Sequence, residues 1–172
     1  MDTLIFEGKA YTRRSQKWID AYNMVAPEGI QRELNSQFVQ QLDPASLSID
    51  ACIAYGDSFK NSGSTGLALK FYEEAIRKAD YTAITYLLPR ITSCYRKTGQ
   101  PQKAIDILTY ANNTFGSKAI TPVLLTSAAA AYCDIGDYAR AKKCCDRAYA
   151  SSGGKYSAEL SLVYNRIKKA TE

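Results

Sequence analysis

Side chains that commonly do chemistry are few in this 172-residue chain, and their spacing favours packing over catalysis. The chain has no histidine, which removes the commonest general base and the commonest metal ligand. It has five cysteines, an odd number, and the adjacent pair Cys144 and Cys145 has the wrong spacing for a zinc knuckle. We find no glycine-rich phosphate loop and no pairing of a nucleophile with a base. We therefore expect a protein that is not an enzyme and that needs no metal or cofactor.

The cysteines are expected mainly in the core. Cys52, Cys94 and Cys145 fall at positions where helices pack, and a free cysteine there behaves as a small hydrophobic residue. Cys133 is expected to face the groove, where an exposed thiol could be oxidised. Metal or redox chemistry is the less favoured alternative for this set.

A cluster of basic and aromatic residues near the N-terminus is a candidate nucleic-acid site. Alternation along a strand would place an aromatic ring beside arginines, as on surfaces that bind single strands. The simpler interpretation is that Tyr11 and Trp18 form the core of a small sheet. The cluster consists of Lys9, Tyr11, Arg13, Arg14, Lys17 and Trp18.

Composition sets broad limits on the partner and the compartment. The net charge is +5, from 22 basic and 17 acidic residues, which is weak support for a nucleic-acid partner. No apolar run approaches the roughly 18 residues that span a bilayer, and the run from Leu4 to Phe6 is too short for an export signal. We expect a cytoplasmic protein with no membrane partner and an undetermined oligomeric state.

The elements that position these residues are predicted by a stretch that occurs three times. Phe59, Tyr95 and Tyr132 are separated by 36 and 37 residues, and a glycine follows each of them four positions later. A fixed period of this length is typical of a helical solenoid. Two columns of alanine keep the same spacing: Ala68, Ala104 and Ala141, and Ala75, Ala111 and Ala148.

The period predicts three helix–turn–helix repeats within residues 44–172, over about residues 46–80, 82–116 and 121–153. Asp43-Pro44 predicts the start of a first helix that runs to about Ser62. Pro89 predicts either a bend in the first helix of repeat 2 or a late start of that helix. A last helix over residues 157–170 would cap the array.

Residues 1–43 are expected to form a separate module. Short apolar runs and turn residues predict two or three strands over residues 1–26, followed by a helix over 27–42. An isolated hairpin is marginally stable, so we expect it to pack on that helix. The fold class is thus mainly α, an α-α superhelix with a small N-terminal β-hairpin and helix.

The repeated residues resemble the tetratricopeptide pattern. Repeat 1 is the most similar, with Tyr55-Gly56 and Phe59 in its first helix and Ala68, Tyr72 and Ala75 in its second. The repeats differ from the pattern in being longer than the usual length of about 34 residues, and repeat 2 lacks the glycine next to Ile91. The resemblance implies a non-catalytic adaptor or scaffold whose concave groove holds a peptide or helix of another protein.

The first helix of each repeat would line that groove. Arg90 and Lys97 would form a basic centre for an acidic group, although a solvated face explains them equally well. Family members that clamp a C-terminal carboxylate use lysine and asparagine where this chain has Ile53 and Asp57, so no such ligand is expected. The groove positions are Asp50, Ile53, Asp57, Lys60, Tyr86, Arg90, Ser93, Lys97, Thr126, Ala130 and Cys133.

Two other functions stay open beside the adaptor. The N-terminal module would be the active part of a regulator that binds nucleic acid or another ligand. Alternatively, the chain would hold a secreted or aggregation-prone partner, although secretion chaperones of similar size are acidic and have helical N-termini. The basic residues of the last repeat are expected to form a solvated convex face: Arg140, Lys142, Lys143 and Arg147.

Overall fold

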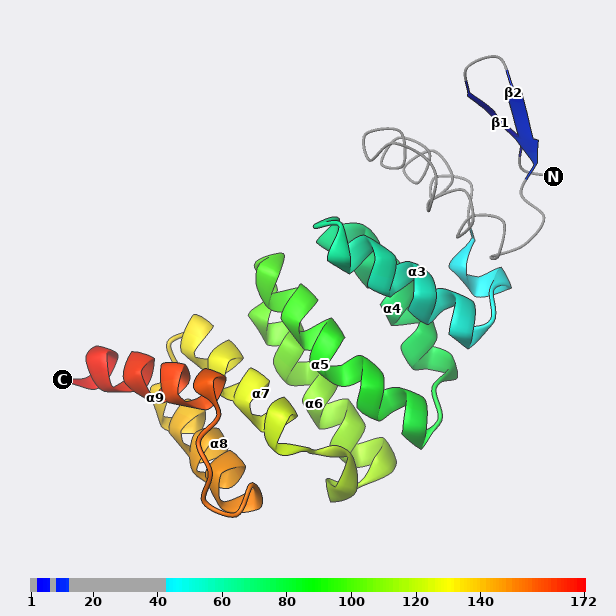
Figure 1. The fold of residues 1–172 in the computed structure, drawn as a ribbon. Helices are drawn as coiled ribbons and strands as arrows, with labels where there is room; N and C mark the ends of the chain where they lie inside the picture. Colours follow the sequence, from blue (N-terminus) through cyan, green and yellow to red (C-terminus); the bar gives the residue numbers. More distant parts are fainter. Residues whose placement is uncertain (1–2, 7–8, 13–42) are drawn as a thin grey trace.

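The computed structural model of this protein describes residues 3–6, 9–12 and 43–172 (Figure 1). Its described part is mainly helical, and residues 43–172 contain seven α-helices and two short 3-10 helices. No helix in this range has the length and apolarity needed to cross a membrane. The α-helices are α3 (Ile49–Asn61), α4 (Thr65–Lys78), α5 (Tyr81–Lys97), α6 (Pro101–Phe115), α7 (Pro122–Asp134), α8 (Tyr138–Ser151) and α9 (Ala158–Thr171), and the 3-10 helices are η1 (Pro44–Ser46) and η2 (Ser117–Ala119).

Each helix packs on the next one along the chain, and the helices follow one another in order through the molecule (Figure 1). In addition, α5 contacts α7, and α7 contacts α9, so these three helices form one continuous row. The arrangement confirms the prediction of a mainly helical fold built by helix-on-helix packing. It is compatible with the stacked solenoid that the sequence period predicts.

The turn inside each helix pair has the same backbone geometry. A glycine adopts a positive φ of 71–82°, which a residue with a side chain rarely does. The residue after it donates its N–H to the carbonyl of the aromatic residue five positions earlier, at 2.8–2.9 Å. The glycines are Gly63, Gly99 and Gly136, and the hydrogen bonds run from Ser64 to Phe59, from Gln100 to Tyr95 and from Asp137 to Tyr132.

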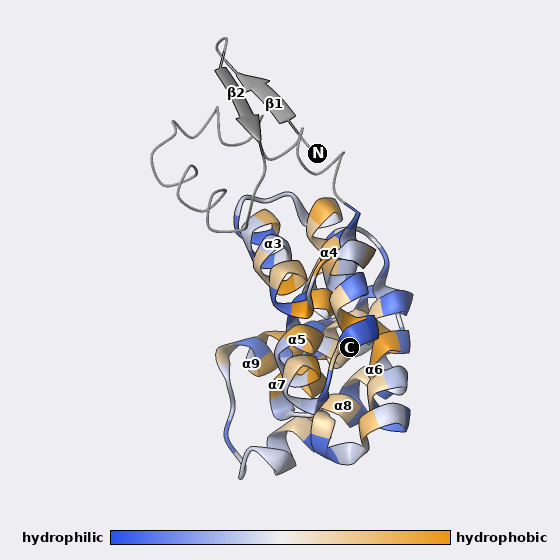
Figure 2. Ribbon diagram, turned by 90° about the vertical axis from the view of Figure 1, so that its right-hand side faces the viewer, coloured by the Kyte–Doolittle hydropathy of each residue, from blue (hydrophilic) through white to orange (hydrophobic). Residues whose placement is uncertain are grey.

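The core lies between the paired helices. All six alanines of the two recurring columns are fully buried, so the helices approach closely where side chains are small. Cys52, Cys94 and Cys145 are also fully buried, as their positions in the period predict. Figure 2 shows hydrophobic residues where the helices face one another and hydrophilic residues along their outer surfaces.

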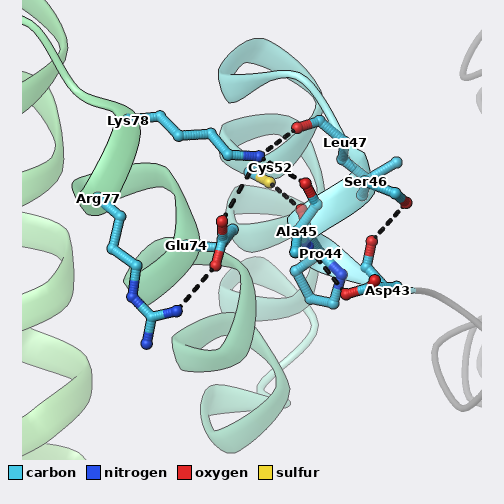
Figure 3. A network of polar contacts seen from close by, with 9 residues as sticks. All are labelled: Asp43, Pro44, Ala45, Ser46, Leu47, Cys52, Glu74, Arg77 and Lys78. Carbon is cyan, nitrogen blue, oxygen red and sulfur yellow. Dashed lines mark hydrogen bonds and ion pairs between the residues drawn. The ribbon is translucent and has the colours of Figure 1, made fainter.

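The array begins differently from the prediction, because the helix predicted from Pro44 to Ser62 is two elements. Asp43 caps η1 by accepting the N–H of Ala45, and the chain then becomes extended at Leu47. Ser48 caps α3, which begins at Ile49. Lys78 of α4 holds this turn by donating to the carbonyls of Ala45 and Leu47, at 3.0 and 2.7 Å (Figure 3).

Pro89 lies inside α5, which begins at Tyr81, so the alternative of a late helix start is wrong. The proline ring has no N–H to donate to the carbonyl four residues earlier, and the helix continues through it. Thr92, which is fully buried, donates its hydroxyl to the carbonyls of Leu88 and Pro89, at 2.8 and 3.1 Å. Its polar group is therefore satisfied inside the helix itself.

Near the N-terminus, β1 (Thr3–Phe6) and β2 (Lys9–Thr12) pair antiparallel, with Thr3 opposite Thr12 and Phe6 opposite Lys9. The helix predicted over 27–42, any third strand and their packing lie outside the described residues. The predicted N-terminal module of residues 1–43 therefore stays a prediction.

Gly56 of α3 offers a test of the close helix approach. A Cβ at this position would lie 2.5 Å from Cε1 of Tyr72, whose side chain is fully buried and has no room to withdraw. We expect Gly56→Ala to lower the free energy of unfolding by about 1–3 kcal/mol in urea titrations, as overpacking of a core does. Gly66→Ala is the matched control, because nothing lies within 4 Å of its new Cβ; it should raise stability by about 0.5–1 kcal/mol. Equal stability of the two variants would contradict this account of the packing.

Candidate protein-binding groove

Asp57 of α3 is the centre of a network that joins three helices. Its carboxylate accepts hydrogen bonds from the hydroxyls of Tyr72 on α4 and Tyr86 on α5, the latter at 2.6 Å. Arg90 of α5 forms an ion pair with it, with Nε 3.4 Å from Oδ1. The Arg90 guanidinium also lies over the Tyr86 ring, 3.4 Å from its centroid, in cation–π geometry. This set of contacts links the first two helix pairs.

The network keeps both tyrosines as hydrogen-bond donors and neutralises Arg90. Burial, and then the hydrogen bond to Asp57, raises the pKa of Tyr72. The hydrogen bond to Asp57, and then burial, raises the pKa of Tyr86. The charge of Arg90 is already paired within the molecule, so of the predicted basic centre Lys97 is the member left exposed to solvent.

A second carboxylate, Asp134 at the end of α7, joins α5, α7 and α9. Arg96 donates from Nε to its Oδ2 at 2.7 Å, and Arg166 donates from Nη1 to its Oδ1 at 2.6 Å. Burial opposes its ionisation, but these two hydrogen bonds outweigh that effect and lower the pKa of Asp134. Two arginines thus share one carboxylate, which leaves one positive charge in excess at this point.

The C-terminal groove is a cavity of about 380 Å³ between α5, α7 and α9. Ala130 and Val163 give it a buried apolar floor, whereas the side chain of Leu162 is 68% exposed. Arg96 and Arg166 supply positive charge, and Glu159 supplies one negative charge. The lining residues are Ser93, Arg96, Thr126, Ser127, Ala130, Glu159, Leu162, Val163 and Arg166.

A neighbouring cavity of about 470 Å³ extends the C-terminal groove toward the turn between α5 and α6. Ser93 and Arg96 line both cavities, while Lys97, Gly99, Pro101 and Asp134 line the second one. The pair formed by Arg96 and Asp134 therefore lies at the boundary of the two cavities. Together they make a surface where apolar contact and positive charge are adjacent.

The structure separates the predicted groove residues into several environments. Ser93, Thr126 and Ala130 line the C-terminal groove, and Lys97 lines its neighbour. Asp57, Tyr86 and Arg90 belong to the network between α3 and α5. Cys133, which the sequence places on the groove, is only 2% exposed and is inaccessible to a partner. The remaining positions are on α3, where Asp50 is exposed and Ile53 and Lys60 are half-buried.

The sequence pattern does not predict the residues that give the C-terminal groove its positive charge and its exposed apolar surface. The register of the repeat predicts Lys97 and Cys133 in the groove, whereas the structure places their neighbours Arg96 and Asp134 at the cavities. The pattern of the last helix predicts only a cap, whereas its residues Leu162 and Arg166 line the groove. The one signal available was the position of Arg96 next to Lys97, directly before a turn glycine.

The N-terminal basic and aromatic cluster is only partly covered by the structure. Lys9 and Tyr11 lie on β2, and the other four members lie outside the described residues: Arg13, Arg14, Lys17 and Trp18.

Within the described part, no group of three or more histidine, cysteine or acidic side chains is arranged to hold a metal ion. No known protein-family model and no curated protein matches the chain. Inference about function therefore depends on the chemistry of the groove.

Thiol chemistry gives a test of core accessibility. Desolvation by burial raises the pKa of all five cysteines, that of Cys145 to about 12, so the reactive thiolates are scarce at neutral pH. We expect a disulfide-exchange reagent at pH 7.5 to react slowly with the native protein, at Cys144 first because the other four are buried. All five thiols should react at once in denaturant, which serves as the control. Rapid native labelling of Cys133 would contradict its burial under α9.

Asp134→Asn tests the second carboxylate network. The lowered pKa of Asp134 means that its stabilisation is complete above the usual carboxyl value of 3.8 and is lost as the pH falls through the lower folded-state pKa. We expect the variant to lose about 1–2 kcal/mol of unfolding free energy at pH 7, and the difference from the original protein to shrink as the pH falls below the usual carboxyl value of 3.8. Asp146→Asn is the control; its carboxylate is half-exposed, so its loss should be smaller. A pH-independent deficit would contradict the ionic role of Asp134.

Proposed function

We propose that this protein is a non-catalytic adaptor of the tetratricopeptide kind that binds a segment of a partner protein in the C-terminal groove. The observation that carries the proposal is the exposed side chain of Leu162, which lies in a cavity that also contains two arginines sharing one carboxylate. Three turns with the same glycine conformation and the same hydrogen bond, at the sequence period, support the repeat class.

The apolar part of the groove favours an apolar side chain of the partner. Leu162 is exposed beside the buried Ala130 and Val163, so a partner residue placed there would remove hydrocarbon surface from water. Such burial contributes about 25 cal/mol per Å². Val123, one turn before Ser127 on α7, is 63% exposed and extends the apolar surface available.

The charged part of the groove favours an acidic side chain in the same segment. Arg96 and Arg166 form ion pairs with the same carboxylate, that of Asp134, and Lys97 adds a positive charge in the neighbouring cavity. A carboxylate that arrives here would find donors already oriented by their existing bonds. The partner segment therefore carries an apolar residue within about one helical turn of an acidic one, and the preformed helices lose little entropy when it binds.

The five free cysteines are compatible with a reducing compartment, and we place the adaptor in the cytoplasm as part of the same proposal. The N-terminal module as a nucleic-acid regulator and the chaperone-like holder are the alternatives from other classes. Neither alternative is supported by the apolar and positively charged residues of the C-terminal groove, which support the adaptor.

Site-specific crosslinking tests the adaptor proposal. A photoreactive amino acid is placed at position 162 or, as a matched control, at Tyr110, which is 40% exposed on α6 and lines neither cavity. We expect a discrete crosslinked partner from position 162 alone, and its loss when Lys97→Glu is added. Mass spectrometry of the product should show an acidic residue close to the crosslinked site. Crosslinks of equal yield from position 110, or none from 162 in cells that make the protein, would sink the proposal.

A further inference from the structure

The positive charge of this protein is concentrated at its C-terminal end. Residues 138–172, which hold α8 and α9, contain 8 of the 22 basic residues but only 3 of the 17 acidic ones, a net charge of +5. Because the net charge of the whole chain is also +5, the remainder of the chain is balanced. The surface of α8 and α9 therefore attracts polyanions more strongly than the rest of the molecule does.

An aromatic stack lies at the same end. Tyr156, in the loop between α8 and α9, is 59% exposed, and its ring centroid lies 4.5 Å from that of Tyr149. Tyr164 of α9 contacts the Tyr156 ring edge-on, with centroids 5.7 Å apart. The hydroxyl of Tyr164 donates to Asp146 at 2.6 Å, which fixes its ring. Tyr156 thus presents aromatic surface to solvent from a supported position.

Three lysines are connected to the stack by sequence or by a shared partner. Lys155 is the residue before Tyr156, and Lys142 forms an ion pair with Asp146 at 2.9 Å. Lys168, one turn beyond Tyr164, is 3.8 Å from Glu172. Both pairs are more than half exposed, and exposed ion pairs are weak and screened by salt, so a phosphate group can compete for these lysines.

We propose that the α8–α9 edge, defined by Lys142, Lys155, Tyr156, Tyr164 and Lys168, binds single-stranded nucleic acid. An unpaired base stacks on the exposed ring of Tyr156, while the adjacent phosphates contact the lysines. A duplex keeps its bases stacked inside and offers no free face to a tyrosine. An acidic protein would pair with the lysines but has no purine or pyrimidine face for Tyr156, so the combination favours a nucleic acid.

This edge is independent of the C-terminal groove. Arg166 of α9 points to Asp134 on α7, whereas Tyr164 of the same helix points to Asp146 on α8. The two surfaces are therefore on different sides of α9. A variant of one surface leaves the contacts of the other unchanged, so the proposal does not depend on the adaptor function.

Fluorescence anisotropy with a labelled 20-nucleotide oligo-U and oligo-dT tests the proposal. We expect binding that weakens as salt rises, with a slope of log affinity against log salt of about −2 for three contacted phosphates. Tyr156→Ala should weaken binding by about 5- to 100-fold at constant slope, because it removes one stacked base, and Tyr156→Phe should restore it. Lys142→Glu with Lys155→Glu should weaken binding and also flatten the slope.

Matched controls are Tyr110→Ala and Lys118→Glu, an exposed tyrosine and an exposed lysine away from this edge, which should bind as the original protein does. Circular dichroism confirms that every variant is folded. The proposal is overturned if the oligonucleotides do not bind, or if Tyr156→Ala binds them unchanged. It is also overturned if a polyglutamate peptide of equal charge displaces them as well as unlabelled oligo-U does, which would identify the edge as an acidic-protein site.

Discussion

Close approach between paired helices is the constraint on which the rest of this structure depends. Where α3 crosses α4, Gly56 leaves the space that the ring of Tyr72 fills. The equivalent positions in repeat 2 are Thr92 and Leu108, and in repeat 3 they are Ala129 and Cys145. Repeat 2 has a leucine where repeat 1 has the tyrosine ring, so it has no ring at this position for a glycine to accommodate.

Two aspartates then set how the pairs are placed relative to one another. Asp57 connects α3, α4 and α5, and Asp134 connects α5, α7 and α9. The two networks differ in net charge. Asp57 is paired with one arginine and accepts from two neutral hydroxyls, whereas Asp134 is paired with two arginines. The first network is therefore closed and structural. The second leaves a positive charge in excess beside a cavity, which is why the proposed partner site is the C-terminal groove.

The parts of the fold that sequence predicted are those governed by local chemistry. A turn glycine at positive φ, a buried alanine column and a helix cap each act within a few residues, so their spacing alone reveals them. The period could not predict the partners of the groove residues, because the pairing of Asp57 with Arg90 joins residues that are distant in sequence. Whether a basic residue on a helix faces a partner or a neighbouring carboxylate depends on the angle between helices, which the period does not specify.

The helix α9 contributes to the core and to both proposed surfaces. A stacked array ends with an apolar face that must be covered, and α9 covers it with Leu160, Val163 and Ile167. Covering that face requires a stripe only about a third of the helix surface wide. The remaining surface of α9 borders α7 on one side and α8 on the other. Its residues are not constrained by the core: Leu162 and Arg166 lie toward the C-terminal groove, and Tyr164 and Lys168 lie toward the α8–α9 edge. The residues outside the buried stripe of α9 are therefore the ones from which both proposed surfaces are built.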